Sequence, residues 1–107
     1  MNVGPAIRII RKQLNISQYE LADKSKISQT SLSQIENGIK RPSPKTMKKV
    51  CEALDIPEAV IYILALDDAH VPESKRAVYK IIYPSIKSLA LQIVGTEYEE
   101  HIEAERA

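Results

Sequence analysis

The sequence predicts an all-α protein, a domain of five short helices followed by a C-terminal helical extension. Apolar residues recur at three- and four-residue spacing through most of the chain, which is typical of helices with one buried face. Proline or a small polar residue stands at each point where such a segment begins. The 107 residues include five Tyr but no Phe or Trp, so aliphatic side chains must fill the core, as suits packed helices.

The first two helices are expected within residues 5–25. Helix one begins at Pro5, which is well tolerated at a first helical position, and ends at Asn15. Ser17 is the N-cap of helix two, and Glu20 three residues later completes a capping box. This second helix runs to about Ser25. The predicted inward residues are Ile7, Ile10, Leu14, Leu21 and Ala22.

Three more helices are expected up to residue 66. Ser28 caps the third, and residues 37–38, Asn-Gly, end it because both accept left-handed geometry. A basic, proline-containing loop follows at residues 39–44, where Ser43 caps helix four. Pro57 opens helix five. The predicted inward residues of helices three and four are Leu32, Ile35, Met47, Val50, Cys51 and Leu54.

Charge divides the chain although its net charge is only +1. Residues 1–54 hold ten basic and four acidic side chains, a net charge of roughly +6, and the rest holds five basic and ten acidic, roughly −5. A basic first half attracts polyphosphate, whereas an acidic second half is repelled by it and must serve another purpose. Taken alone, however, a basic half is more often only a solvated face.

The extension begins after a polar loop at residues 67–72, so we expect domains at 1–68 and 69–107. Its apolar stripe predicts one or two amphipathic helices interrupted at Pro84, with Tyr83 biased away from helical geometry. The stripe either folds back on helix five or pairs with its copy in a second chain, and we favour pairing. An acidic tail follows Gly95. The stripe consists of Val78, Ile81, Ile82, Ile86, Leu89, Ile93 and Val94.

Several classes of protein are disfavoured. A single cysteine forms no internal disulfide, and no His/Cys spacing suits a metal, so we expect neither metal nor cofactor. Nothing places Ser, His and Asp as a triad, and we expect no enzyme. Basic residues interrupt residues 1–15, unlike a signal peptide, and the longest apolar run, 59–66, is too short to cross a bilayer. A cytoplasmic protein is expected.

The connection between helices two and three, residues 24–27, carries the functional prediction. Such a short link lets the third helix project at a steep angle, a shape that fits the major groove of DNA. The exposed positions of this helix hold amides and hydroxyls, which can bind base edges. Exposed Gln and Ser are usually only solvated, so this pattern alone does not favour base contact.

The residues SQYELADKSKISQTSLSQIENGIKRPSPKTMKKVCEAL resemble the lambda-repressor-like, or Xre-type, helix-turn-helix domain of phage and bacterial regulators. The resemblance covers residues 6–66 and implies binding to double-stranded DNA. It implies base contacts from Gln29, Thr30, Ser33 and Gln34, and DNA backbone contacts from Gln18, Asn37, Lys40 and Arg41. Lys45 lies just beyond the same helix, where it also suits a phosphate.

Two positions depart from the family pattern. Lys26 stands in the turn where the family usually has Gly, and a non-glycine residue in left-handed geometry costs on the order of 1 kcal/mol. Asp55 stands where Gly often ends helix four, and Asp tolerates that geometry. We expect the fold to survive both changes.

The leading hypothesis is a transcriptional repressor that acts as a homodimer on a palindromic operator. The alternative is an antitoxin, in which the helices after Val71 bind a toxin protein while the first half binds DNA. Whether bound DNA is repressed or activated, and whether an effector controls it, is left open by the sequence. Cys51 is expected to be a core residue, and His70 and His101 to be solvated.

Overall fold

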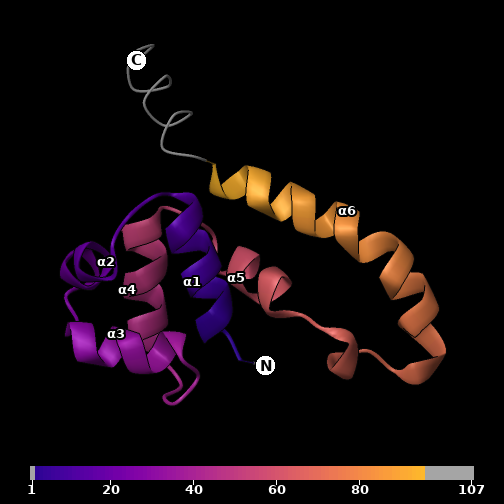
Figure 1. The fold of residues 1–107 in the computed structure, drawn as a ribbon, viewed down its shortest axis with the longest axis horizontal. Coiled ribbons are helices and arrows are strands. Elements are labelled where there is room, and N and C mark those ends of the chain that lie inside the picture. Colours follow the sequence, from indigo (N-terminus) through magenta and orange to yellow (C-terminus); the bar gives the residue numbers. More distant parts are fainter. Residues whose placement is uncertain (1, 96–107) are drawn as a thin grey trace, which may run out of the picture.

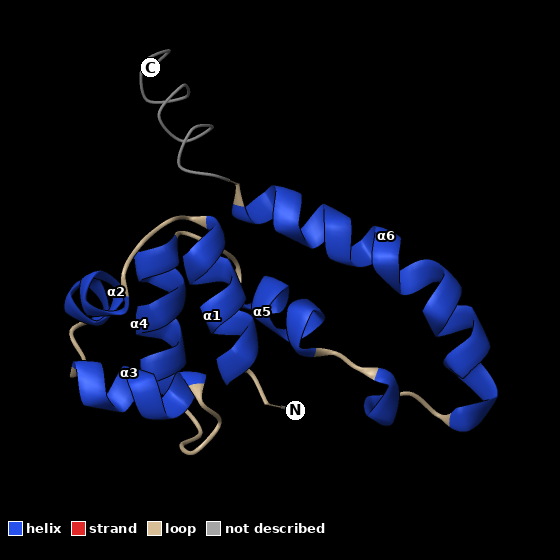
Figure 2. Ribbon diagram, viewed as in Figure 1, coloured by secondary structure: helices blue, strands red, loops and turns tan. Residues whose placement is uncertain are grey.

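A computed structural model describes residues 2–95 of the chain, and these residues are entirely helical apart from loops and turns (Figures 1 and 2). Five helices form a compact bundle, the segment after the fifth helix leads away from the bundle, and a long, curved sixth helix runs back to it. The predicted all-α architecture is confirmed. The helices are α1 Gly4–Gln13, α2 Gln18–Ser25, α3 Gln29–Glu36, α4 Pro44–Leu54, α5 Glu58–Ala65 and α6 Arg76–Val94, with 3-10 turns at Asp68–His70 and Glu73–Lys75.

The predicted serine caps are confirmed at three helices. The side chains of Ser17, Ser28 and Ser43 each accept a hydrogen bond from the backbone N–H three residues later, at 3.0, 3.0 and 3.1 Å. Each cap satisfies one of the donors that a helix N-terminus leaves without a partner. Two starts differ by one residue from prediction. α1 begins at Gly4 rather than Pro5, and Pro57 keeps an extended backbone just before α5.

The core lies where the apolar spacing placed it. The predicted inward residues of helices one to four are all buried, and Val60, Ile61 and Leu64 of α5 join them. Asn15, Lys26 and Asp55 adopt left-handed geometry with φ near +57°, which ends α1, α2 and α4 respectively. The chain therefore accepts backbone strain at Lys26 and Asp55, where glycine would relieve it.

The extension differs from prediction at Pro84. α6 runs through this residue as one helix of 19 residues, although proline removes one backbone hydrogen bond. Contacts in the turns just before Pro84 support the helix: Tyr79 and Tyr83 donate hydroxyl hydrogen bonds to the carbonyls of Leu66 and Ile63, at 3.3 and 2.7 Å. The expected interruption is therefore wrong, and packing against α5 explains why.

The apolar surface of α6 is divided between the core and solvent. Ala90 and Val94 are buried in the same core as α1 and α5, and Gln13 of α1 donates to the carbonyls of Leu91 and Gly95, both at 2.8 Å. Leu91 is partly buried against this core, and six other large aliphatic residues stay exposed, with exposed fractions from 40% to 79%. They are Val78, Ile81, Ile82, Ile86, Leu89 and Ile93.

Two negative findings apply to residues 2–95. No helix there is both long and apolar enough to cross a membrane. No cluster of three His, Cys, Asp or Glu side chains is arranged to hold a metal ion within the same residues. The acidic tail and His101 lie outside the described residues.

Candidate nucleic-acid interface

The outer face of α3 holds the four polar side chains that were predicted to contact bases. Leu32 and Ile35 are buried on the inner side of the helix. Gln29, Thr30 and Gln34 are exposed, and Ser33 is half-buried, with its hydroxyl 3.5 Å from the Asn37 amide nitrogen. One helix face therefore holds two carboxamides and two hydroxyls. These groups supply both donors and acceptors.

The angle of α3 depends on the turn that precedes it. Lys26 has φ 57° and ψ 41°, and its backbone N–H binds carbonyls in the last turn of α2. The chain then reverses within two residues to the Ser28 cap. α2 and α3 lie next to each other (Figure 1), and because their buried faces pack on each other, the polar side of α3 is left outward. The N-termini of both helices carry a Gln at their first position, Gln18 and Gln29.

A buried ion pair lies behind this surface and was not predicted. Arg11 of α1 donates from Nε and Nη2 to the two carboxylate oxygens of Glu36 at 2.8 and 3.0 Å. The exposed fractions of the two side chains are only 11% and 2%. A two-point contact of this kind fixes orientation as well as distance. It therefore fastens the last turn of α3 to α1.

Two glutamines extend the ion pair towards the surface as a chain of side-chain hydrogen bonds. Gln18 Nε2 lies 3.3 Å from Glu36 Oε1, and Gln29 Nε2 lies 3.5 Å from Gln18 Oε1. Gln18 and Gln29, the first residues of α2 and α3, are therefore linked to the buried carboxylate of Glu36. A signal was present in the sequence: Arg11 lies four residues after the inward Ile7, and Glu36 lies four residues after the inward Leu32, so two opposite charges fall on inward faces.

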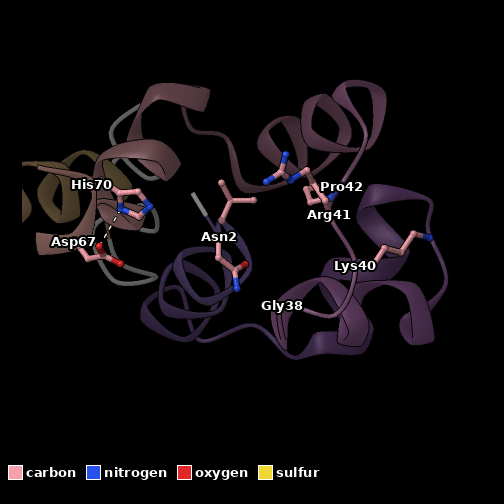
Figure 3. Close-up of a pocket in the computed structure, with 8 residues that line it drawn as sticks. Asn2, Gly38, Lys40, Arg41, Pro42, Asp67 and His70 are labelled. Carbon is pink, nitrogen blue, oxygen red and sulfur yellow. Dashed lines mark ion pairs between the residues drawn. The ribbon is translucent and has the colours of Figure 1, made fainter.

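Lys40 and Arg41 are adjacent in the loop after α3, but their side chains point in different directions (Figure 3). Lys40 Nζ lies 3.1 Å from Ser31 Oγ, on the side of α3. Arg41 points to the other side of the loop, towards a cleft of about 390 Å³ whose far wall holds Asp67 and His70 (Figure 3). Of these two residues, Lys40 is the one that contacts a side chain of α3. Asn37, Lys40, Arg41 and Lys45 are all exposed.

Cys51 lies apart from this surface and is buried in α4. Burial, assisted by the carboxylates of Glu58 and Glu52, raises its pKa from 9.0 to about 11. The thiolate is the reactive form of cysteine, so this thiol is held in its inert form. The prediction that Cys51 is a core residue is confirmed.

Comparison with known proteins places the bundle in a family. The helix-turn-helix family model matches residues 7–61. The chain is 34% identical over 65 residues to the competence pilus inhibition repressor of Acinetobacter baylyi, covering 61% of this chain and 59% of that protein. It is 38% identical over 61 residues to the immunity repressor protein of Bacillus phage phi105, covering 57% and 42%. The chain thus spans about half the length of these relatives.

Two solved structures of the clp gene regulator ClgR from Corynebacterium glutamicum are similar to the fold. One matches with a TM-score of 0.58 at 34% identity, over 60% of this chain and 83% of that one. The other matches with a TM-score of 0.61 at 27% identity, over 80% and 92%. The second match spans more of this chain than residues 7–61.

Proposed function

This chain belongs to the lambda-repressor-like, or Xre-type, helix-turn-helix family, and we propose that it binds double-stranded DNA as a transcriptional regulator. The observation that carries the proposal is the outward face of α3, which holds amides and hydroxyls on a helix whose last turn is fastened to α1 by a buried ion pair. The relatives above are named as repressors or regulators. We infer repression as the mode of action.

Base readout is assigned to the exposed face of α3. Gln29 and Gln34 each offer a carboxamide that can donate and accept together at an adenine edge, and Thr30 offers a methyl group for thymine. Ser33 is half-buried and contributes a hydroxyl. Because Gln29 is also held by Gln18, its amide is oriented before DNA arrives, which reduces the entropy lost on binding.

Backbone contacts are assigned to the groups around α3. Gln18 lies at the N-terminus of α2, where backbone N–H groups favour a phosphate. Lys40 and Asn37 follow α3 directly, and Lys45 lies in the first turn of α4. Arg41 must turn out of its cleft to reach DNA, and as a long exposed side chain it can do so. These contacts position the protein without reading sequence.

The exposed stripe on α6 supports a homodimer. Ile82, Ile86, Leu89 and Ile93 follow one another at spacings of four, three and four residues, which is the pattern of a helix that packs against another helix. All four are at least 40% exposed in the single chain. A second copy would cover this stripe through a two-fold contact, and two copies of α3 would then read a near-palindromic operator in successive major grooves.

The DNA proposal is tested by selecting bound duplexes from a random pool and measuring affinity by fluorescence anisotropy. Gln34→Ala should weaken binding to the selected site by about 1 to 3 kcal/mol and relax its sequence preference. Gln92→Ala is the matched control, since Gln92 is exposed on α6, far along the chain from α3, and its amide donates to the Ser88 hydroxyl. A wild-type protein that prefers no sequence, even at low salt, would contradict the assignment.

The dimer is tested by light scattering with Leu89→Asp, which places a charge in the stripe. The variant should have the mass of one chain where the wild type has the mass of two. Ile39→Asp is the control, because Ile39 is 76% exposed but lies outside α6. A wild-type protein of monomeric mass would remove the dimer proposal and favour the alternative, a partner protein such as a toxin on the same stripe. The expected cytoplasmic location remains a prediction.

A further inference from the structure

We infer that Gly4, the first residue of α1, and Asn2, which precedes the helix, are positioning residues that fix the angle at which α3 is presented to DNA. The inference rests on the proposed base readout by α3. Neither residue belongs to the outward face of α3. They lie where the start of α1 meets the last turn of α3 and the loop that follows α3.

Gly4 brings the two backbones into direct contact. A Cβ atom at this position would overlap the carbonyl oxygen of Ile35, and would lie 2.9 Å from its carbonyl carbon and 3.2 Å from that of Glu36. Carbon atoms in good contact lie about 3.5 to 4.0 Å apart. The atoms opposed to Gly4 belong to the backbone of α3, so no flexible side chain can move aside.

Asn2 makes a second contact, with Gly38 in the loop after α3. Its Oδ1 accepts a hydrogen bond from the Gly4 N–H at 3.1 Å, while its amide nitrogen abuts Gly38 (Figure 3). Gly38 has φ +77°, a left-handed conformation that suits glycine, and its N–H donates to the Ile35 carbonyl at 3.0 Å. The same carbonyl is therefore bounded by Gly4 on one side and by Gly38 on the other.

These contacts are close enough to control readout. α3 has eight residues and is thus about 12 Å long, so a shift on the order of 1 Å at its last turn also tilts the residues that face DNA. A binding constellation must be held within about 0.5 Å of its productive geometry. Adding one methyl group at Gly4 exceeds that tolerance. The preference for the cognate sequence should fall, whereas binding to DNA in general should not.

The test uses the full chain and compares affinity for the selected duplex with affinity for a scrambled one. Gly4→Ala should lower this ratio at least tenfold while affinity for scrambled DNA stays within twofold. Asn2→Ala, which removes only an exposed side chain, should lower it about threefold and keeps the test usable if Gly4→Ala does not fold. Ile61→Val is the matched control: it trims a fully buried residue of α5 and should leave the ratio unchanged at a temperature where every variant is folded.

A second readout needs no DNA. The backbone amide chemical shifts of residues 29–36 should change along the whole of α3 in Gly4→Ala and stay close to wild type in Ile61→Val. A sequence preference within twofold of wild type in both Gly4→Ala and Asn2→Ala would overturn the inference and leave the proposed function intact. A wild-type protein that prefers no sequence would instead remove the proposed function, and the inference with it.

Discussion

Replacing Glu36 with Gln tests how strongly the buried ion pair holds the fold. The substitution keeps the shape of the side chain but removes the charge that faces Arg11, whose exposed fraction is 11%. Breaking a buried pair by removing one partner costs about 3 to 5 kcal/mol. Arg11 keeps its hydrogen bond to the Ile16 carbonyl at 3.0 Å, so we expect the lower end, about 3 kcal/mol.

That loss is large against the stability of an ordinary domain, which is about 5 to 15 kcal/mol. For a domain of this size each kcal/mol shifts Tm by about 4 to 8 °C, so Glu36→Gln should melt about 12 to 24 °C below wild type. The measurement is thermal unfolding followed by circular dichroism. Glu20→Gln is the control, because the Glu20–Lys24 pair is half exposed and 3.8 Å apart, and it should cost well under about 1 kcal/mol.

A double variant separates the pair from its surroundings. Arg11→Met and Glu36→Leu together replace the ion pair by apolar side chains, which is often close to neutral in a buried site. The double variant should therefore recover most of the stability that Glu36→Gln loses. A Tm of Glu36→Gln within about 3 °C of wild type would refute the reasoning, since it would show that the pair contributes little despite its burial.

Further predictions follow from single residues. Because the pKa of Cys51 lies about two units above the ordinary 9.0, its thiol at pH 8 should react with iodoacetamide about a hundredfold more slowly in the folded than in the unfolded chain. Mass spectrometry measures both rates, and equal rates would contradict the prediction. The unfolded thiol loses its proton first, so stability measured by denaturant titration should fall as pH rises from about 9 to about 11. Lys26→Gly should raise Tm, because glycine relieves left-handed strain of about 1 kcal/mol, and an unchanged or lower Tm would count against this strain. Tyr83→Phe removes the 2.7 Å hydrogen bond to Ile63 and should speed proteolysis between α5 and α6, whereas equal cleavage rates would show that the bond does not hold α6.

The helix starts and the core could be predicted because their causes are local. A serine just before a helical segment can supply an N-cap whatever the rest of the fold, and the structure confirms this at Ser17, Ser28 and Ser43. The Arg11–Glu36 pair could not be predicted in the same way. Its partners are 25 residues apart, and only the packing of α1 against α3 brings them together.

The site was predictable as a set of residues but not as an arrangement. The exposed positions of α3 follow from helical spacing, and all of them lie on its outer side. The opposite directions of Lys40 and Arg41 depend on the path of a loop, which no periodicity describes. The close approach at Gly4 is equally invisible in the sequence, since a glycine near a helix start has several possible causes.

The division of α6 between core and solvent affects how its role must be tested. Removing the chain after residue 68 would delete Ala90 and Val94 from the core and leave Gln13 of α1 without its two carbonyl acceptors. Such a truncation would weaken the bundle directly, so a loss of DNA binding would say nothing about pairing. A substitution in the exposed stripe, such as Leu89→Asp, avoids this because Leu89 is 59% exposed. We expect the wild type to have the mass of two chains. If Leu89→Asp keeps the wild-type Tm but loses both that mass and operator affinity, the loss of affinity comes from the lost pairing.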